Sequence, residues 1–132
     1  MQEELRLSEI YPVNAKRLFD AWLSGEELTE ITGTKSEARP VAGAKFSTGD
    51  GHIRGSNISL QPYGRILQSW RADDFPPGSP DSRLEILFEK VNGGTRLTLI
   101  HTRIPEGHKG DYEKGWKKHF LKPMKKYFKK KK

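Results

Sequence analysis

Hydrophobic and polar residues alternate most clearly along two segments in the last third of the chain. Residues 82–90 read SRLEILFEK and residues 95–103 read TRLTLIHTR. A period of two is typical of a strand with one buried face, and the intervening Gly93-Gly94 predicts a turn. We therefore expect a hairpin with one inward face, formed by Leu84, Ile86, Phe88, Leu97, Leu99 and His101.

A helical period follows this hairpin. From Asp111 onward, bulky apolar residues recur every three or four positions and therefore share one side of an α-helix. Pro123 cannot donate a backbone hydrogen bond to the carbonyl of His119, so we expect a kink there. The helix should pack on the apolar face of the sheet through Tyr112, Trp116, Phe120, Met124 and Tyr127.

The first third of the chain predicts one strand and two short helices. Residues 3–13 alternate weakly and are followed by Asn14, a plausible N-cap for a helix over Ala15–Leu23. Ser24 followed three residues later by Glu27 has the form of a capping box, which predicts a second helix ending at Gly33. Because one helix stops where the next begins, the two should form a V.

Short strands between turn residues occupy the middle of the chain. The strands are expected at 41–47, 52–60 and 65–71, and residues 72–81 read as a loop. Asp50-Gly51 predicts the first hairpin turn. The element order is thus a strand, two short helices, a run of antiparallel strands and a long C-terminal helix, which indicates an α+β domain.

Length and charge refine this picture. At 132 residues, the chain is large enough for one core, and we expect one domain over residues 1–128 and a lysine-rich tail over 129–132. Seven of the 24 basic residues follow Leu121, and the remaining 17 equal the number of acidic residues. The net charge of +7 therefore belongs to the end of the chain, and a solvated lysine run predicts no specific nucleic-acid partner.

Several classes of function lack support in the sequence. The chain has no cysteine, and its four histidines have no zinc-site spacing, so we expect no metal, no cofactor and no catalytic constellation. Asp73 and Asp74 read as solvated turn residues, since neighbouring side chains in an extended loop point in different directions. The N-terminal MQEELRLSEI is no signal peptide and no stretch could span a membrane, so we expect a cytoplasmic monomer.

Five motifs occur in order between about Leu5 and Phe128, and they read RLFDAWLSGEELTEITG, KFSTGDGHIRGSN, GRILQSWR, DSRLEILFEKVNGGTRLTLIHTRIPEG and YEKGW…PMKKYF. With these motifs the chain resembles the domain of the activator of heat-shock protein 90 ATPase, a member of the START-like (SRPBCC) superfamily. The resemblance implies a helix-grip fold, in which a curved antiparallel sheet grips a long C-terminal helix, often with a cavity between them. The element order deduced from the pattern agrees with this fold.

A cavity in this position would be lined by inward-facing residues, and apolar walls with few polar groups are typical of ligand sites. His101 is either a core histidine with a protein partner or a polar group facing a ligand, and Trp70 and Trp116 are either core or part of a ligand site. The expected cavity residues are Trp22, Gln68, Trp70, Phe88, His101, Tyr112, Trp116 and Phe120.

Three functions compete at this point. The first is a non-enzymatic binding domain for a lipophilic small molecule in a stress- or chaperone-related setting. The second is a protein-interaction domain that acts on heat-shock protein 90. The third, implied by START-like relatives, is a cyclase or hydrolase of hydrophobic substrates, and its only acid–base candidates are His101 and nearby hydroxyls.

Overall fold

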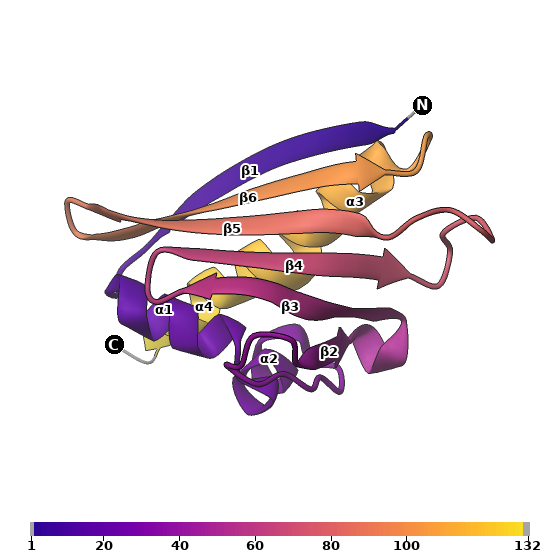
Figure 1. The fold of residues 1–132 in the computed structure, drawn as a ribbon. Coiled ribbons are helices and arrows are strands. Elements are labelled where there is room, and N and C mark those ends of the chain that lie inside the picture. Colours follow the sequence, from indigo (N-terminus) through magenta and orange to yellow (C-terminus); the bar gives the residue numbers. More distant parts are fainter. Residues whose placement is uncertain (1, 131–132) are drawn as a thin grey trace.

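Six antiparallel strands form one sheet in the computed structural model, in the order β1-β6-β5-β4-β3-β2 (Figure 1). The structure describes residues 2–130, with side chains through Lys129. The strands are β1 Glu3–Tyr11, β2 Lys45–Thr48, β3 Ile53–Gln61, β4 Arg65–Ala72, β5 Ser82–Val91 and β6 Gly94–Ile104. The helical elements are α1 Ala15–Trp22, α2 Gly25–Thr32, the 3₁₀ turn η1 Gly49–Gly51, α3 Lys109–Trp116, the π-helical turn η2 Lys117–Leu121 and α4 Lys122–Lys130.

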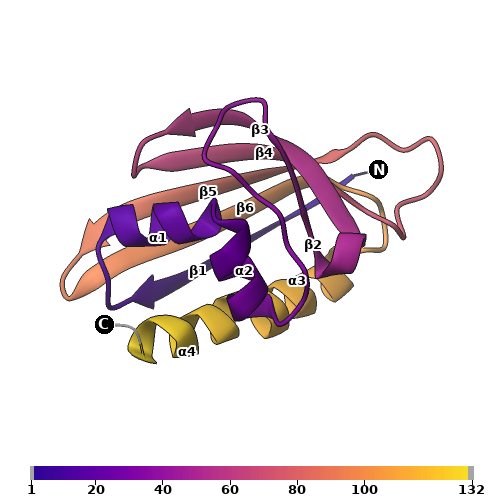
Figure 2. The same cartoon turned by 90° about the horizontal axis from the view of Figure 1, so that it is seen from below.

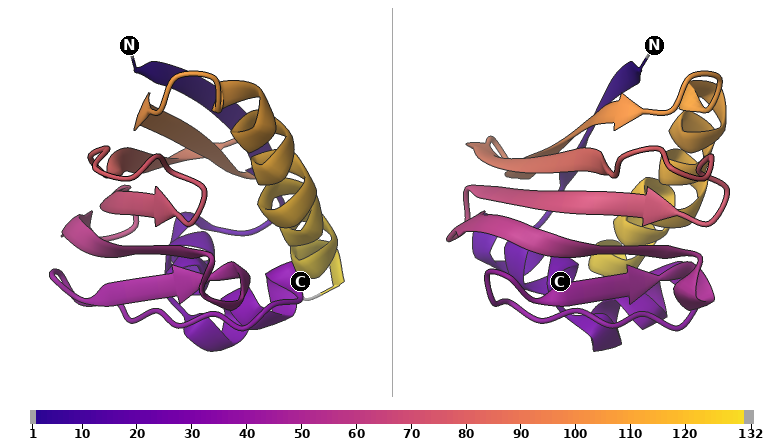
Figure 3. Two further views of the ribbon diagram at one scale, coloured as in Figure 1. Left: turned by 90° about the vertical axis from the view of Figure 1, so that its right-hand side faces the viewer. Right: turned by 45° about the vertical axis from the view of Figure 1, so that its right-hand side comes forward.

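The sheet is curved, and its helices lie on the concave face (Figure 3). Ile66 pairs with Ile86, and Ile86 pairs with Leu99, so one row of fully buried side chains crosses three neighbouring strands. The period of two therefore predicted the buried face correctly. The α+β helix-grip fold is confirmed, and the core lies between this face and the helices.

The two short helices begin and end as the capping residues predict. The side chain of Asn14 accepts a hydrogen bond from the N–H of Arg17 at 2.9 Å, and the hydroxyl of Ser24 accepts one from the N–H of Glu27 at 3.2 Å. Gly33 ends α2 in the left-handed region, with φ of 75°, where a glycine carries no steric cost. Figure 2 shows α1 and α2 meeting at an angle, as the V predicts.

The terminal helix accommodates Pro123 through a π-helical turn. The N–H of Lys122 bonds the carbonyl of Lys117, five residues back, in the turn that precedes the proline. A π turn contains one residue more than an α turn, so the buried positions shift along the sequence. Trp116 and Phe120 face the core before the shift, and Leu121, Met124 and Phe128 face it afterwards.

This shift changes the end of the predicted stripe. Tyr127 is half-buried at the edge of the core, and its hydroxyl donates a hydrogen bond to Glu27 at 2.6 Å. Phe128, which the straight-helix pattern leaves off the stripe, is fully buried and packs edge-on against Tyr11 with ring centroids 6.0 Å apart.

The strand predicted at 41–47 begins later than expected. Gly43 adopts a φ of 86°, and the N–H of Ala44 bonds the carbonyl of Val41, so this stretch forms a turn and β2 starts at Lys45. At the other end of the chain, α4 extends through Lys130, two residues into the expected tail, and Lys131 and Lys132 lie outside the described residues. Within residues 2–130, no helix is both long enough and apolar enough to cross a bilayer.

Candidate ligand site

A cavity of about 410 Å³ lies between the terminal helix and the connection from β2 to β3. The helix side of the cavity is formed by Asp111, Tyr112, Gly115, Trp116, His119 and Phe120. The opposite side is formed by Thr32 at the end of α2 and Thr34 after it, by Thr48, Gly49, Asp50, His52 and Ile53, and by Trp70 of β4.

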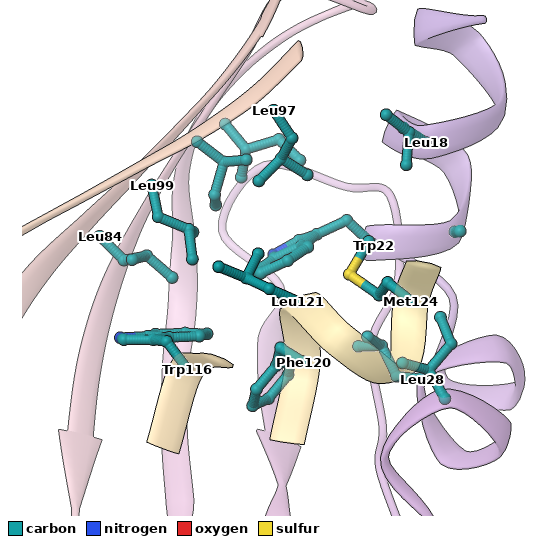
Figure 4. Packing of buried hydrophobic residues seen from close by; sticks show 14 of the residues in the cluster. Leu18, Trp22, Leu28, Leu84, Leu97, Leu99, Trp116, Phe120, Leu121 and Met124 are labelled. Carbon is teal, nitrogen blue, oxygen red and sulfur yellow. The ribbon is translucent and has the colours of Figure 1, made fainter. Parts of the chain in front are cut away.

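Aromatic rings form the floor of this cavity. Trp70 and Trp116 are almost fully buried, and their ring centroids lie 5.7 Å apart. Trp116 also packs on Phe120 at 4.8 Å, and Tyr112 meets Trp70 edge-on at 5.3 Å. Figure 4 shows Trp116 and Phe120 projecting from the terminal helix into the same core as Trp22. These rings therefore lie at the edge of the core. The space beside them is open where the terminal helix passes the β2–β3 connection.

The expected cavity residues divide into two groups. Trp70, Tyr112, Trp116 and Phe120 line the 410 Å³ cavity. The others are buried but do not line it, and they are Trp22, Gln68, Phe88 and His101.

Trp22 and Gln68 border a separate space of about 20 Å³, which is about the size of one water molecule. Phe88 packs edge-on against Phe19 with ring centroids 5.6 Å apart. Neither Phe88 nor His101 lines either space. Facing inward thus places these four residues in the core, outside the lining of the larger cavity.

His101 is a core histidine held between two side chains. The indole N–H of Trp116 donates to its Nδ1 at 3.1 Å, so the neutral ring carries its proton on Nε2, which donates to the Ser82 hydroxyl at 2.7 Å. The Ser82 hydroxyl in turn donates to the carbonyl of Trp70 at 2.9 Å. Burial lowers the pKa of His101 to about 3, because a charged imidazolium would lose its hydration. The ring is therefore neutral at physiological pH.

Gln68 belongs to a second buried polar chain. Its side-chain oxygen accepts a hydrogen bond from the Trp22 indole N–H at 3.4 Å, and its nitrogen donates to Asn57 at 2.9 Å. The Asn57 amide donates to the carbonyls of Arg39 and Val41 at 2.9 and 3.0 Å. These contacts satisfy the buried amide groups and tie the segment between α2 and β2 to the sheet.

Asp73 and Asp74 lie beside the cavity mouth and point to different partners. The Arg54 guanidinium, at 2.7 Å, and the His52 ring, at 3.0 Å, bind Asp73 and hold the pKa of its carboxyl below the usual value. Asp74 accepts a hydrogen bond from the Tyr112 hydroxyl at 2.6 Å. Burial, followed by the contact with Asp74, raises the pKa of that hydroxyl. The two carboxylates thus form no dyad.

Sequence reasoning missed the wall opposite the floor and the glycine that opens it. Gly115 lies in α3, and a Cβ built on it would meet no atom within 4 Å. A glycine inside a helix costs about 1 kcal/mol relative to alanine, so its presence there was a signal of an unusual surrounding.

Within the described part of the chain, no group of three or more His, Asp or Glu side chains could hold a metal ion.

Comparisons with known proteins place the chain in a family. The family described as Activator of Hsp90 ATPase homolog 1-like protein matches residues 12–129. The activator of 90 kDa heat shock protein ATPase homolog from Dictyostelium discoideum is 30% identical over 126 residues, covering 94% of this chain and 32% of that protein. The human activator of 90 kDa heat shock protein ATPase homolog 1 is 23% identical over 125 residues, covering 95% of this chain and 37% of that protein. The chain therefore spans about a third of the length of these relatives.

A solved structure agrees with the sequence match. The crystal structure of an HSP90 activator from Plasmodium falciparum superimposes with a TM-score of 0.82 and 27% identity, covering 89% of this chain and 90% of that one. Fold, motif order and sequence identity thus lead to one assignment. The chain belongs to the family of Activator of Hsp90 ATPase homolog 1-like proteins.

Proposed function

We propose that the chain is a non-enzymatic binding domain in a cytoplasmic, chaperone-related setting, and that its cavity takes a lipophilic small molecule. The observation that carries this proposal is the 410 Å³ space with an aromatic floor. Small-molecule sites have volumes of about 300–1,000 Å³ and are mostly apolar with a few polar groups. The described interior holds no buried polar side-chain atom without a partner, so the recognition groups lie at the cavity wall and mouth.

The state of His101 gives no support to the enzyme alternative. A general base must reach its substrate and must have a pKa near the working pH. His101 lies outside the cavity lining and has a pKa of about 3. The cyclase or hydrolase alternative therefore has little support from the residue on which it depended.

Filling the cavity from Gly115 tests this proposal. A Gly115→Leu side chain would extend into open space, so we expect it to weaken binding of the probe 1-decanol at least tenfold. The measurement is the change in tryptophan fluorescence on titration, since Trp70 and Trp116 line the cavity. The fold should be retained, because replacing a helical glycine by leucine favours the helix by up to about 1 kcal/mol.

Gly110→Leu is the matched control. Gly110 lies in the same helix and also has open space around a built Cβ, but it does not line the cavity. It should leave decanol binding unchanged. A wild-type protein without a saturable response, or a Gly115→Leu variant that binds as tightly as wild type, would contradict the proposal.

A second candidate function is action on a chaperone of the heat-shock protein 90 class. The observation that favours it is the Plasmodium falciparum protein, described as an HSP90 activator, which this chain covers almost completely. The test is ATP turnover by the purified chaperone with and without this chain. Stimulation that is equal for wild type and Gly115→Leu would support action through the surface, and absence of stimulation would count against this candidate.

A further inference from the structure

Apart from the exposed ring of His119, the neutral polar side chains of the cavity wall are mostly committed to protein partners. The Thr32 hydroxyl donates to the carbonyl of Leu28 at 2.8 Å, and the Thr48 hydroxyl shares a hydrogen bond of 2.7 Å with Ser36. The Thr34 hydroxyl accepts from the N–H of Gly49 at 3.1 Å. The Trp116 indole N–H donates to His101, and the Tyr112 hydroxyl donates to Asp74. The wall therefore leaves mainly its charged groups to meet a ligand.

Two carboxylates supply that charge. Asp111 is exposed, and within residues 2–130 no hydrogen bond or ion pair engages its carboxylate. One oxygen of Asp50 accepts a hydrogen bond from the backbone N–H of Lys35 at 2.9 Å, and the other has no partner among the described atoms. The two residues come from opposite sides of the cavity, Asp111 from α3 and Asp50 from η1.

No lysine or arginine lines the cavity, although the chain carries a net charge of +7. Lys114, Lys117 and Lys118 of the same helix are exposed and lie outside the lining. An anionic ligand group would therefore face two carboxylates, with only the imidazoles of His52, which contacts Asp73, and His119 in the lining to compensate them. A cationic group would meet two carboxylates in the same cavity as the aromatic floor.

The aromatic floor favours the same sign of charge. Tryptophan and tyrosine rings attract cations through the negative faces of their π systems, and aromatic walls bind quaternary ammonium groups in this way. Trp70, Trp116 and Tyr112 all line the cavity.

We propose that the ligand of this cavity carries an amine or quaternary ammonium group on an apolar body, with the cation placed between Asp50 and Asp111. This inference rests on the proposed function, since it assumes that the cavity binds a small molecule. It adds the chemical class of the ligand.

Three probes with the same apolar chain test the inference: decyltrimethylammonium, 1-decanol and decyl sulfate, each titrated below its micelle concentration. Decyltrimethylammonium should bind about tenfold more tightly than decanol, since a partly exposed ion pair and a cation–π contact together give roughly this factor. Decyl sulfate should bind more weakly than decanol.

The double variant Asp50→Asn, Asp111→Asn should bind decyltrimethylammonium no more tightly than decanol. Asparagine can still accept the hydrogen bond from Lys35 and tolerates the φ of 57° at position 50, so the turn should persist. Glu89→Gln, on the outer face of β5, removes a carboxylate far from the cavity and should leave all three affinities unchanged.

The outcomes distinguish failure of the cationic-ligand proposal from failure of the proposal that the cavity binds a small molecule. Equal binding of decyltrimethylammonium and decanol by wild type would overturn the cationic ligand while the cavity proposal stood. A preference for the cation that survives in the double variant would also overturn it. Failure of all three probes to bind would count against the proposed function itself.

Discussion

A chain that ends at Gly110 will fail to fold, because the terminal helix supplies much of the core. The helix contributes five buried side chains: Trp116, Phe120, Leu121, Met124 and Phe128. Burying each of them stabilises the fold by about 2–3 kcal/mol, so their sum of at least about 10 kcal/mol is comparable to the total stability of a typical domain, about 5–15 kcal/mol. Circular dichroism and urea titration of the fragment 1–110 should show no cooperative unfolding transition.

Its control is the fragment 1–130, which retains every buried residue of the helix and should unfold cooperatively with wild-type stability. The truncation would also remove the Trp116 partner of the buried His101 ring. A fragment 1–110 with a cooperative transition would show that the sheet and the two short helices form a sufficient core, and the helix-grip account of stability would then be wrong.

Acid will destabilise the protein through His101. The ring has a pKa of about 3 in the folded chain and about 6.5 when unfolded, so the unfolded state binds a proton that the folded state excludes. The contribution of the neutral ring to stability is therefore complete above pH 6.5 and is lost as the pH falls from 6.5 toward 3. With a slope of about 1.4 kcal/mol per pH unit, the loss between pH 7 and pH 4.5 is about 2–3 kcal/mol.

His101→Gln isolates this effect. A glutamine amide supplies one donor and one acceptor but does not titrate, so we expect lower stability at pH 7 and a flatter pH dependence than in wild type. The measurement is the free energy of unfolding in urea at pH 7, 6, 5 and 4.5. Other acidic groups titrate equally in both proteins and cancel in the difference. Parallel pH profiles would show that the ring can be protonated in the folded state.

The strands could be predicted from sequence because alternation reports directly on burial. In β5 and β6, the predicted inward residues from Leu84 to His101 are almost completely buried. The end of the terminal helix could not be predicted, because the regular helical spacing of the stripe was continued past the kink expected at Pro123. The π turn before Pro123 moves the buried position from Tyr127 to Phe128, and only the geometry of the turn reveals that shift.

The candidate site was predictable only in part, for a different physical reason. A period of two tells which way a side chain faces, but it cannot tell a filled interior from an open one. Phe88 and His101 face inward and lie in the core, whereas Trp70 faces inward and borders the cavity. The opposite wall comes from turns around Thr34 and Asp50, which approach the helix only through tertiary packing.

The central claim, that the space beside the terminal helix binds an apolar ligand, is tested most directly by amide and indole chemical shifts during titration with 1-decanol. The account predicts saturable shifts at the indole N–H groups of Trp70 and Trp116 and at the backbone N–H groups of Thr48 and Gly115. Shifts that are absent, or that are confined to outer-face residues such as Glu85, Glu89 and Arg96, would contradict it.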